Sequence, residues 1–210
     1  MSEDFLNGSD ELHVEILRLL EDVVPFPGIR YEVALVACAM ALEHALSLRL
    51  LVRASCFTSA LALMRLQYEA ITRGVWLLYA ATDIQVEILA SPLTLDAESA
   101  AKKMPIFSVL LDQVVAKAPE QASRMLINFK DINWHAMNSF VHSGIHPLRR
   151  HSEGYPEELI ENVIRNSNGL NVMALQLSIV LSGEPRFDGT VRTVQETYHR
   201  VLPGLFSAMN

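Results

Sequence analysis

The chain has 210 residues and a mass of 23.4 kDa, so we expect residues 1–210 to form a single helical domain. Half of the residues are apolar and a fifth are charged, which excludes a disordered chain and allows a large buried core. The formal net charge of −7 argues against a chain-wide basic surface for duplex nucleic acid.

Helical periodicity dominates the sequence and strand-like alternation is nearly absent, which predicts an all-α fold of about seven or eight helices in one bundle. The first helix is expected to be capped by Ser9 or Asp10 and to end at Pro25. The later helices are expected over about residues 29–51, 55–89, 105–118, 120–143, 157–181 and 190–209, the last perturbed at Pro203, with a mobile segment after Pro92 and a connecting loop over 144–156. The third of these, 55–89, is apolar almost all round and is expected to be the buried central helix.

The cysteines and the N-terminus favour a cytoplasmic location. Only Cys38 and Cys56 occur, without the spacing of a zinc site or redox motif. The acidic N-terminus lacks the features of a signal peptide. Polar side chains interrupt the longest apolar runs, so no membrane span is expected.

Three charged residues stand alone in the apolar stretch between Ala60 and Ala81. Arg65, Glu69 and Arg73 are spaced four apart, which places them on one helical face. Unpaired charges there would cost several kcal/mol each, so Glu69 is expected to be buried and paired with both arginines. The ladder is either a structural ion-pair network or one side of a polar cavity with a positive charge left for an anion.

A second polar group follows Trp134. On a helix, His135, Asn138, Ser139 and His142 share one stripe. Arg149 and Arg150 follow in the next segment, which makes this the strongest local concentration of basic and titratable groups. The alternative is structural: His142 is a core histidine bonded to Glu69, and the two arginines are a solvated pair.

A zinc site formed by His142, His146 and Glu69 is not favoured. Although the histidines have the spacing of helical metal ligands, Gly144 lies between them and Pro147 follows, so His146 is expected to leave the helix. We therefore expect no metal and no cofactor.

Both groups contribute to a resemblance that spans about residues 30–185. The run Ser59-Ala60-x-Ala62-Leu63-x-Arg65-x3-Glu69-x3-Arg73-x2-Trp76-Leu77-x2-Ala80, followed by Trp134, Asn138-Ser139-x2-His142-x-Gly144 and Arg149-Arg150, resembles a bacterial protein family catalogued only as a domain of unknown function. The resemblance implies a cytoplasmic helical protein with no established activity.

A wider similarity is to HEPN-type helical domains, many of which are metal-independent ribonucleases of toxin or phage-defence systems. Their signature is an arginine, four to six residues, and a histidine. Arg192 and His199 form the only such pair in this chain, and about one pair is expected by chance.

These observations predict a binding protein whose inner cavity is lined by Arg65, Glu69, Arg73, Asn138 and His142, with Arg149 and Arg150 nearby. Its ligand is expected to be a small anionic or nucleotide-like molecule, or a partner. One alternative is a ribonuclease in which His142 is the general acid or base and Arg65 or Arg73 stabilises the phosphate charge, with RNA as substrate. Another is a pure interaction protein with a structural ion-pair core. The apolar composition also predicts a homodimer.

Overall fold

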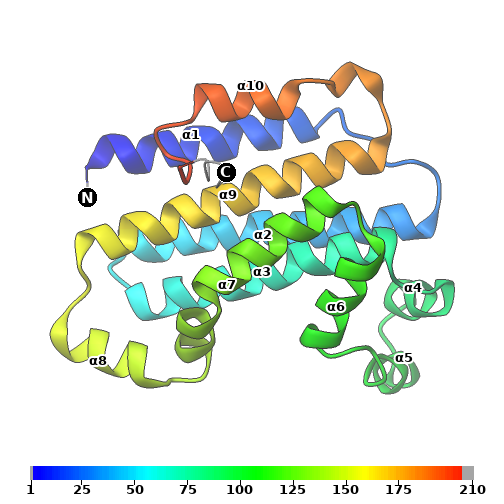
Figure 1. Cartoon of the computed structure of the whole chain (residues 1–210), viewed down its shortest axis with the longest axis horizontal. Helices are drawn as coiled ribbons and strands as arrows, with labels where there is room; N and C mark the ends of the chain where they lie inside the picture. The colour runs from blue at the N-terminus through cyan, green and yellow to red at the C-terminus, as the bar shows by residue number, and fades with distance from the viewer. Residues whose placement is uncertain (1, 205–210) are drawn as a thin grey trace.

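The computed structural model describes residues 2–204, and this part of the chain is all helical with no strand (Figure 1). The helices in chain order are α1 (Glu3–Leu20), α2 (Ile29–Arg53), α3 (Phe57–Tyr79), α4 (Asp83–Ala90), α5 (Leu95–Ala101), α6 (Phe107–Lys117), α7 (Glu120–Val141), α8 (Ile145–Glu153), α9 (Glu157–Ser182) and α10 (Thr190–Thr197), with a short 3₁₀ helix at Pro185–Phe187. The prediction of an all-α fold is confirmed. The expected count of seven or eight helices is too low for the described residues, which contain ten α-helices.

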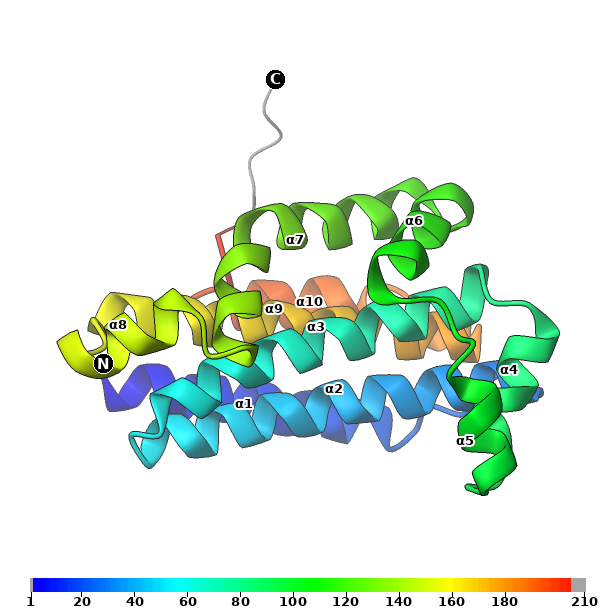
Figure 2. The same cartoon turned by 90° about the horizontal axis from the view of Figure 1, so that it is seen from below.

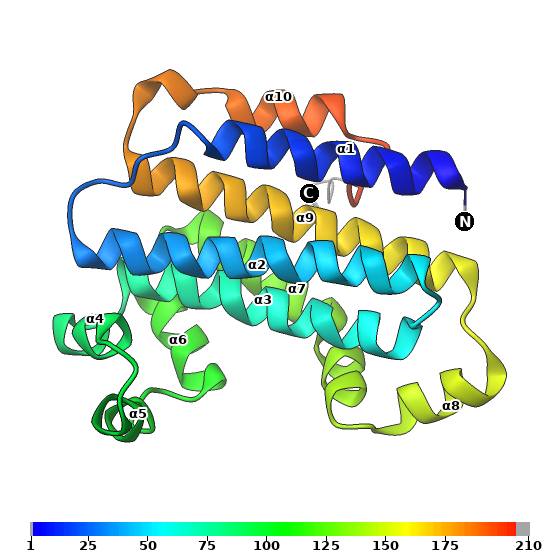
Figure 3. The same cartoon turned by 180° about the vertical axis from the view of Figure 1, so that it is seen from behind.

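The helices form three layers. Seen from below, α1 and α2 lie on one side, α3, α9 and α10 lie in the middle, and α7 with α6 lies on the opposite side (Figure 2). The view from behind places α2 in front and α7 at the back (Figure 3). The outer face of α2 and the face that carries α7 are therefore on opposite sides of the molecule.

The core is centred on α2, α3 and α9, which the sequence predicts only in part. The small residues of α2, such as Ala37 and Ala41, are buried and allow close packing, as expected. Gly74 of α3 lies so close to α9 that an added Cβ would meet Leu177 at 2.8 Å. The predicted central helix therefore shares its position with α9, whose buried face runs the whole length of the helix.

The expected helix 55–89 is divided into two. α3 ends at Tyr79, and Thr82 caps α4 by accepting a hydrogen bond from the Gln85 backbone N–H, while the Gln85 side chain accepts one from the Thr82 N–H. This reciprocal pair is a capping box, whose Thr-x-x-Gln pattern is visible in the sequence. The prediction of one long helix missed this break because the apolar periodicity continues across it.

The expected loop 144–156 and the expected mobile segment after Pro92 also contain helices, α8 and α5. Pro147 stands in the first turn of α8, where its missing N–H has no helical acceptor to lose. α5 is capped by Thr94 but buries no side chain.

The helices near the two ends of the chain also differ from the prediction. α1 begins at Glu3, capped by Ser2, and Ser9 is a buried residue in its middle. Neither Ser9 nor Asp10 is a cap. α10 ends at Thr197, so residues 198–204 of the expected last helix are not helical, and its residues 205–209 lie outside the described residues.

One described helix, α2, is long and apolar enough to cross a bilayer by length and composition, and less than half of its most apolar stretch is buried.

Candidate functional site

Of the predicted Arg65–Glu69–Arg73 ladder on α3, the structure contains only the Arg65–Glu69 pair. Arg65 donates from Nε to Oε1 of Glu69 at 2.8 Å, and its Nη2 is 2.7 Å from the same oxygen. Glu69 retains 31% side-chain exposure and Arg65 13%, so this ion pair lies at the edge of the helix packing. Arg73 is half-buried and makes no hydrogen bond or ion pair with the described residues. The expectation of a buried Glu69 bonded to two arginines is therefore wrong.

Arg65 connects α3 to α7. Its Nη1 donates to Oδ1 of Asn138, and its guanidinium lies 4.3 Å from the centroid of the Trp134 ring. We call Arg65, Glu69, Trp134 and Asn138 the Arg65 cluster. A carboxylate, an amide and an aromatic face together use much of the binding capacity of this guanidinium. The arrangement holds two helices together and leaves little of Arg65 for a ligand.

Aromatic rings continue from this cluster into the core. Trp134 stacks on Phe107 with centroids 5.1 Å apart, and Tyr68 contacts Phe107 at 5.5 Å and Phe129 at 5.0 Å. The Tyr68 hydroxyl donates to the Leu126 carbonyl at 2.9 Å, and burial raises the pKa of this tyrosine. These contacts fix α6 and α7 over α3.

The Asn138–Gly144 motif builds a turn. His142 is the C-terminal cap of α7 and is exposed, with its backbone N–H bonded to the Asn138 carbonyl. Ser139 accepts a hydrogen bond from the His146 N–H at 3.0 Å, and a Cβ on Gly144 would lie 2.6 Å from the Ser139 hydroxyl oxygen. The motif therefore joins α7 to α8.

His142 is exposed and makes no hydrogen bond or ion pair with Glu69 among the described residues, so the interpretation as a core histidine bonded to Glu69 is wrong. A cavity shared by His142 and the Arg65 cluster stays a prediction.

Arg149 and Arg150 lie together on α8. With Ile145, His146 and Glu153 they line a shallow depression of about 270 Å³. Arg149 is paired with Glu153, one helical turn away, which neutralises part of its charge.

A larger groove lies between α7, α9 and α10, and we call it the α7–α10 groove. Its volume is about 770 Å³. It is lined by Met125, Asn128, Phe129, Ile132 and Asn133 of α7, by Asn166, Gly169, Val172 and Met173 of α9, by Arg192, Gln195 and Glu196 of α10, and by His199, Leu202, Pro203 and Gly204 after it. None of the seven predicted site residues is among them. The groove includes Arg192 and His199, whose spacing in the sequence is no more than chance predicts.

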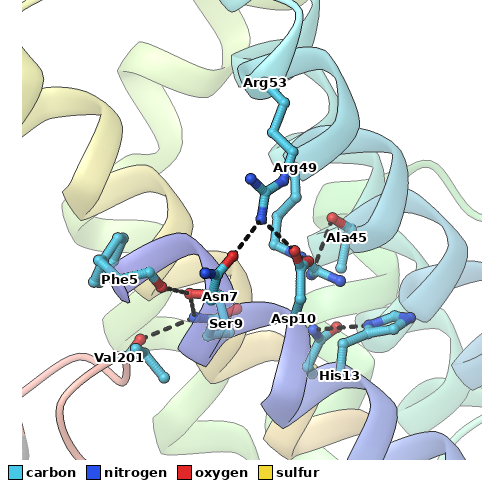
Figure 4. Close-up of polar contacts among 11 residues, drawn as sticks. Phe5, Asn7, Ser9, Asp10, His13, Ala45, Arg49, Arg53 and Val201 are labelled. Carbon is cyan, nitrogen blue, oxygen red and sulfur yellow. Dashed lines mark hydrogen bonds and ion pairs between the residues drawn. The ribbon is translucent and has the colours of Figure 1, made fainter. Parts of the chain in front are cut away.

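A second polar cluster lies between α1 and α2 (Figure 4). Arg49, with 2% side-chain exposure, donates to Oδ1 of Asp10 at 2.7 Å, and Arg53 donates to Oδ2 of the same carboxylate at 2.6 Å. Nη2 of Arg49 is buried without a hydrogen-bond partner in the described structure. Together with His13, these residues are the Arg49 cluster.

The electrostatics of the Arg49 cluster follow from its burial. Burial, with the nearby Arg49 charge, lowers the pKa of His13 to about 4. Burial alone would raise the pKa of Asp10, but hydrogen bonds from Arg53 and Arg49 lower it. Asn171 contacts His13 Nδ1 at 3.5 Å and accepts a hydrogen bond from Gln67, which links α1 through α9 to α3. No spacing in the sequence indicates this network, because its members come from four distant segments.

Among residues 2–204, no three His, Cys, Asp or Glu side chains are grouped as a metal site.

The comparisons with known proteins supply a family and no activity. No curated protein and no solved structure matches the chain significantly. The profile described as "Family of unknown function (DUF6988)" matches residues 38–204, which is most of the chain. The matched range includes the Arg65 cluster and the whole α7–α10 groove, and it excludes α1. The chain therefore belongs to this family of unknown function, DUF6988.

Proposed function

We propose that the protein binds a small amphipathic organic anion in the α7–α10 groove. The observation that carries the proposal is the size of this groove, about 770 Å³, with a mainly apolar lining. Ligand sites for small molecules have volumes of about 300–1,000 Å³ and combine an apolar lining with a few polar groups.

The apolar part of the groove suits a flexible or ring-containing hydrocarbon body. Met125 and Phe129 line it from α7, and Val172 and Met173 line it from α9. Methionine side chains adapt to irregular shapes and make favourable contacts with aromatic rings. The groove therefore accepts an apolar body without demanding one shape.

The polar rim suits a single acidic group. Arg192 uses its Nε to bond Glu196 at 2.8 Å, which neutralises part of its charge but leaves its terminal Nη groups as hydrogen-bond donors. The ring of His199 is oriented by a contact of 2.9 Å between Nδ1 and the Glu196 carbonyl. Since a carbonyl only accepts hydrogen bonds, neutral His199 carries its proton on Nδ1 and offers Nε2 as an acceptor. Arg192 is thus the residue expected to bind the anionic head.

Neutral hydrogen-bonding groups complete the lining. Asn166 donates to Asn133 at 3.2 Å, and Asn133 donates to the Phe129 carbonyl at 2.9 Å. Nδ2 of Asn166 has a second hydrogen, which has no acceptor among the described residues and can bond polar groups along a ligand.

The first test compares two probes that differ only in the head group. We expect dodecanoate to raise the melting temperature by mass action and to displace 8-anilinonaphthalene-1-sulfonate, and dodecanol to do so less well. Met173→Trp should fill the groove and abolish binding of both probes, while Leu148→Trp on exposed α8 should leave it unchanged. If neither probe binds the wild type, the proposal is wrong.

The second test concerns the charge. Arg192→Gln should weaken dodecanoate about tenfold, as expected for loss of one charge-assisted hydrogen bond. Arg124→Gln is the matched control because Arg124 also pairs with a glutamate one turn away on an exposed helix, and it does not line the groove. Equal effects of the two changes would argue against an anionic head at Arg192.

A ribonuclease is the second candidate, because the groove brings Arg192 and His199 to one rim. An imidazole can transfer protons and a guanidinium can stabilise the charge of a phosphate transition state. RNA cleavage in EDTA that is lost in His199→Ala, and retained in His142→Ala, would favour this candidate over the binding protein.

A further inference from the structure

We propose that the α7–α10 groove is the docking site of the chain's own next segment, residues 205–210, which competes there with external ligands. These six residues follow Gly204 and lie outside the described structure. Gly204 itself lines the groove, so the described chain ends at the groove wall. Docking of the segment does not require a small ligand. Only its consequence for ligand binding rests on the proposed function.

The chain that leads to this segment is held on α9. After α10 it runs back to α9 (Figure 1), where the buried Asn168 donates to the Val201 carbonyl at 2.9 Å. Pro203 packs against Gly169 so closely that a Cβ on the glycine would lie 3.1 Å from the proline Cγ. These contacts hold the point at which the segment begins at one end of the groove.

The segment matches the lining of the groove in polarity. Four of its six residues are apolar, namely Leu205, Phe206, Ala208 and Met209. The other two, Ser207 and Asn210, carry no charge. In the groove, Met125 and Ile132 of α7 are large and apolar and are nevertheless exposed. Contact between the two sets removes apolar surface from water on both sides, which favours docking.

The charges of the groove also favour an uncharged occupant. Its lining has one arginine and one glutamate, Arg192 and Glu196, which pair with each other and are both exposed. An apolar segment can therefore cover the rest of the lining without burying a charge. A polyanion such as a nucleic acid would meet a single arginine that is already paired.

The length of the segment suits the groove. The lining residues of α7 run from Met125 to Asn133, eight positions apart, which is about 12 Å along the helix. An extended chain spans about 3.3 Å per residue, so residues 205–208 cover this distance. Because the segment is tethered at Gly204, its effective concentration at the groove is in the millimolar range, and weak contacts are sufficient to dock it.

A docked segment weakens the binding of any external ligand to the same groove. The apparent dissociation constant rises by the reciprocal of the fraction of molecules in which the groove is open. If the segment is docked in about four of every five molecules, a ligand binds about fivefold more weakly than to the open groove. The segment therefore makes the groove a self-inhibited binding site.

The test measures how fast chymotrypsin cuts the full chain after Phe206, followed by mass spectrometry. A docked segment is cut only while it is out of the groove, so the rate follows the open fraction. Met125→Glu places a charge in the lining and Met173→Trp fills the groove, so each should raise the rate about fivefold. Leu148→Trp, on exposed α8, is the control and should leave the rate unchanged.

Met125 is exposed, so Met125→Glu is expected to fold, and circular dichroism will confirm this. Equal cleavage rates in the wild type and Met125→Glu would overturn the proposal. Protection that increases with protein concentration would also overturn it, because the segment would then dock in the groove of a second copy.

Dodecanoate separates this proposal from the proposed function. It should speed the cut in the wild type by displacing the segment, and should have no effect in Met125→Glu, where the segment is already released. If the variants are cut faster but dodecanoate has no effect on the wild type, the segment docks in the groove and the proposed ligand is wrong. If dodecanoate binds the wild type and Met173→Trp does not speed the cut, the docking proposal is wrong and the ligand site stands.

Discussion

Two arginines each join a pair of helices in this protein, and their surroundings differ. Arg49 is almost fully buried between α1 and α2, and its partner Asp10 is shared with Arg53. Arg65 is 13% exposed at the edge of α3, and it contacts Asn138 and the Trp134 ring besides Glu69. Water can solvate the second pair if one partner is lost, but it cannot easily reach Arg49. Equal short distances in the two ion pairs therefore correspond to different energies.

The largest expected effect is the loss of Asp10. Asp10→Ala should lower the free energy of unfolding by about 3–5 kcal/mol, because it leaves the Arg49 guanidinium buried and uncompensated. Urea denaturation measures this change. A second variant, Asp10→Ala with Arg49→Met, should recover much of the loss by removing the stranded charge. A single variant within about 0.5 kcal/mol of wild type would show that the comparison is wrong.

The next effect is the response of the Arg49 cluster to acid. The pKa of His13 is about 4 in the folded protein and 6.5 as the ordinary value, so the unfolded state binds more protons between these values. The free energy of unfolding should therefore fall by up to about 3 kcal/mol as the pH drops from 6.5 to 4. Burial also lowers the pKa of His44, which adds in the same direction. Asp10 adds its own loss only below its ordinary pKa of 3.8.

Melting temperatures of the wild type and of His13→Gln, measured between pH 6.5 and 4, separate the contribution of His13 to the acid response from that of His44. His13→Gln should flatten most of the dependence because glutamine does not titrate. If the slope is unchanged in His13→Gln, the acid response has another origin.

The Arg65 cluster should respond more weakly. Glu69→Ala should cost about 1 kcal/mol, since Arg65 is partly exposed to water and keeps its contacts with Asn138 and Trp134. The same urea titration serves here. A loss as large as that of Asp10→Ala would mean that Glu69 is as buried in solution as its sequence surroundings suggested.

The smallest effect is expected at Arg73. Arg73→Gln should change stability by less than about 0.5 kcal/mol, because the guanidinium has no hydrogen bond or ion pair among the described residues to lose. A marked gain in stability would show that repulsion from Arg65 is important, and a marked loss would reveal an interaction that the structure does not contain.

The sequence by itself determined the helical class, because an apolar residue every three or four positions buries a stripe only on a helix. It also located α2, α7 and α9 closely, where Pro or Gly stands at a helix end. It predicted the Arg65–Glu69 pair correctly because that pair is local, one turn apart on one helix.

The tertiary structure decided everything that depends on distant segments. Asp10 and Arg49 are 39 positions apart, and Arg65 and Asn138 are 73 apart, so no local spacing predicts either contact. Exposure was misjudged at Glu69 and His142 because apolar neighbours in sequence do not show which side of a helix another helix covers. The α7–α10 groove forms only where three helices and the chain after α10 converge, and that arrangement follows from packing.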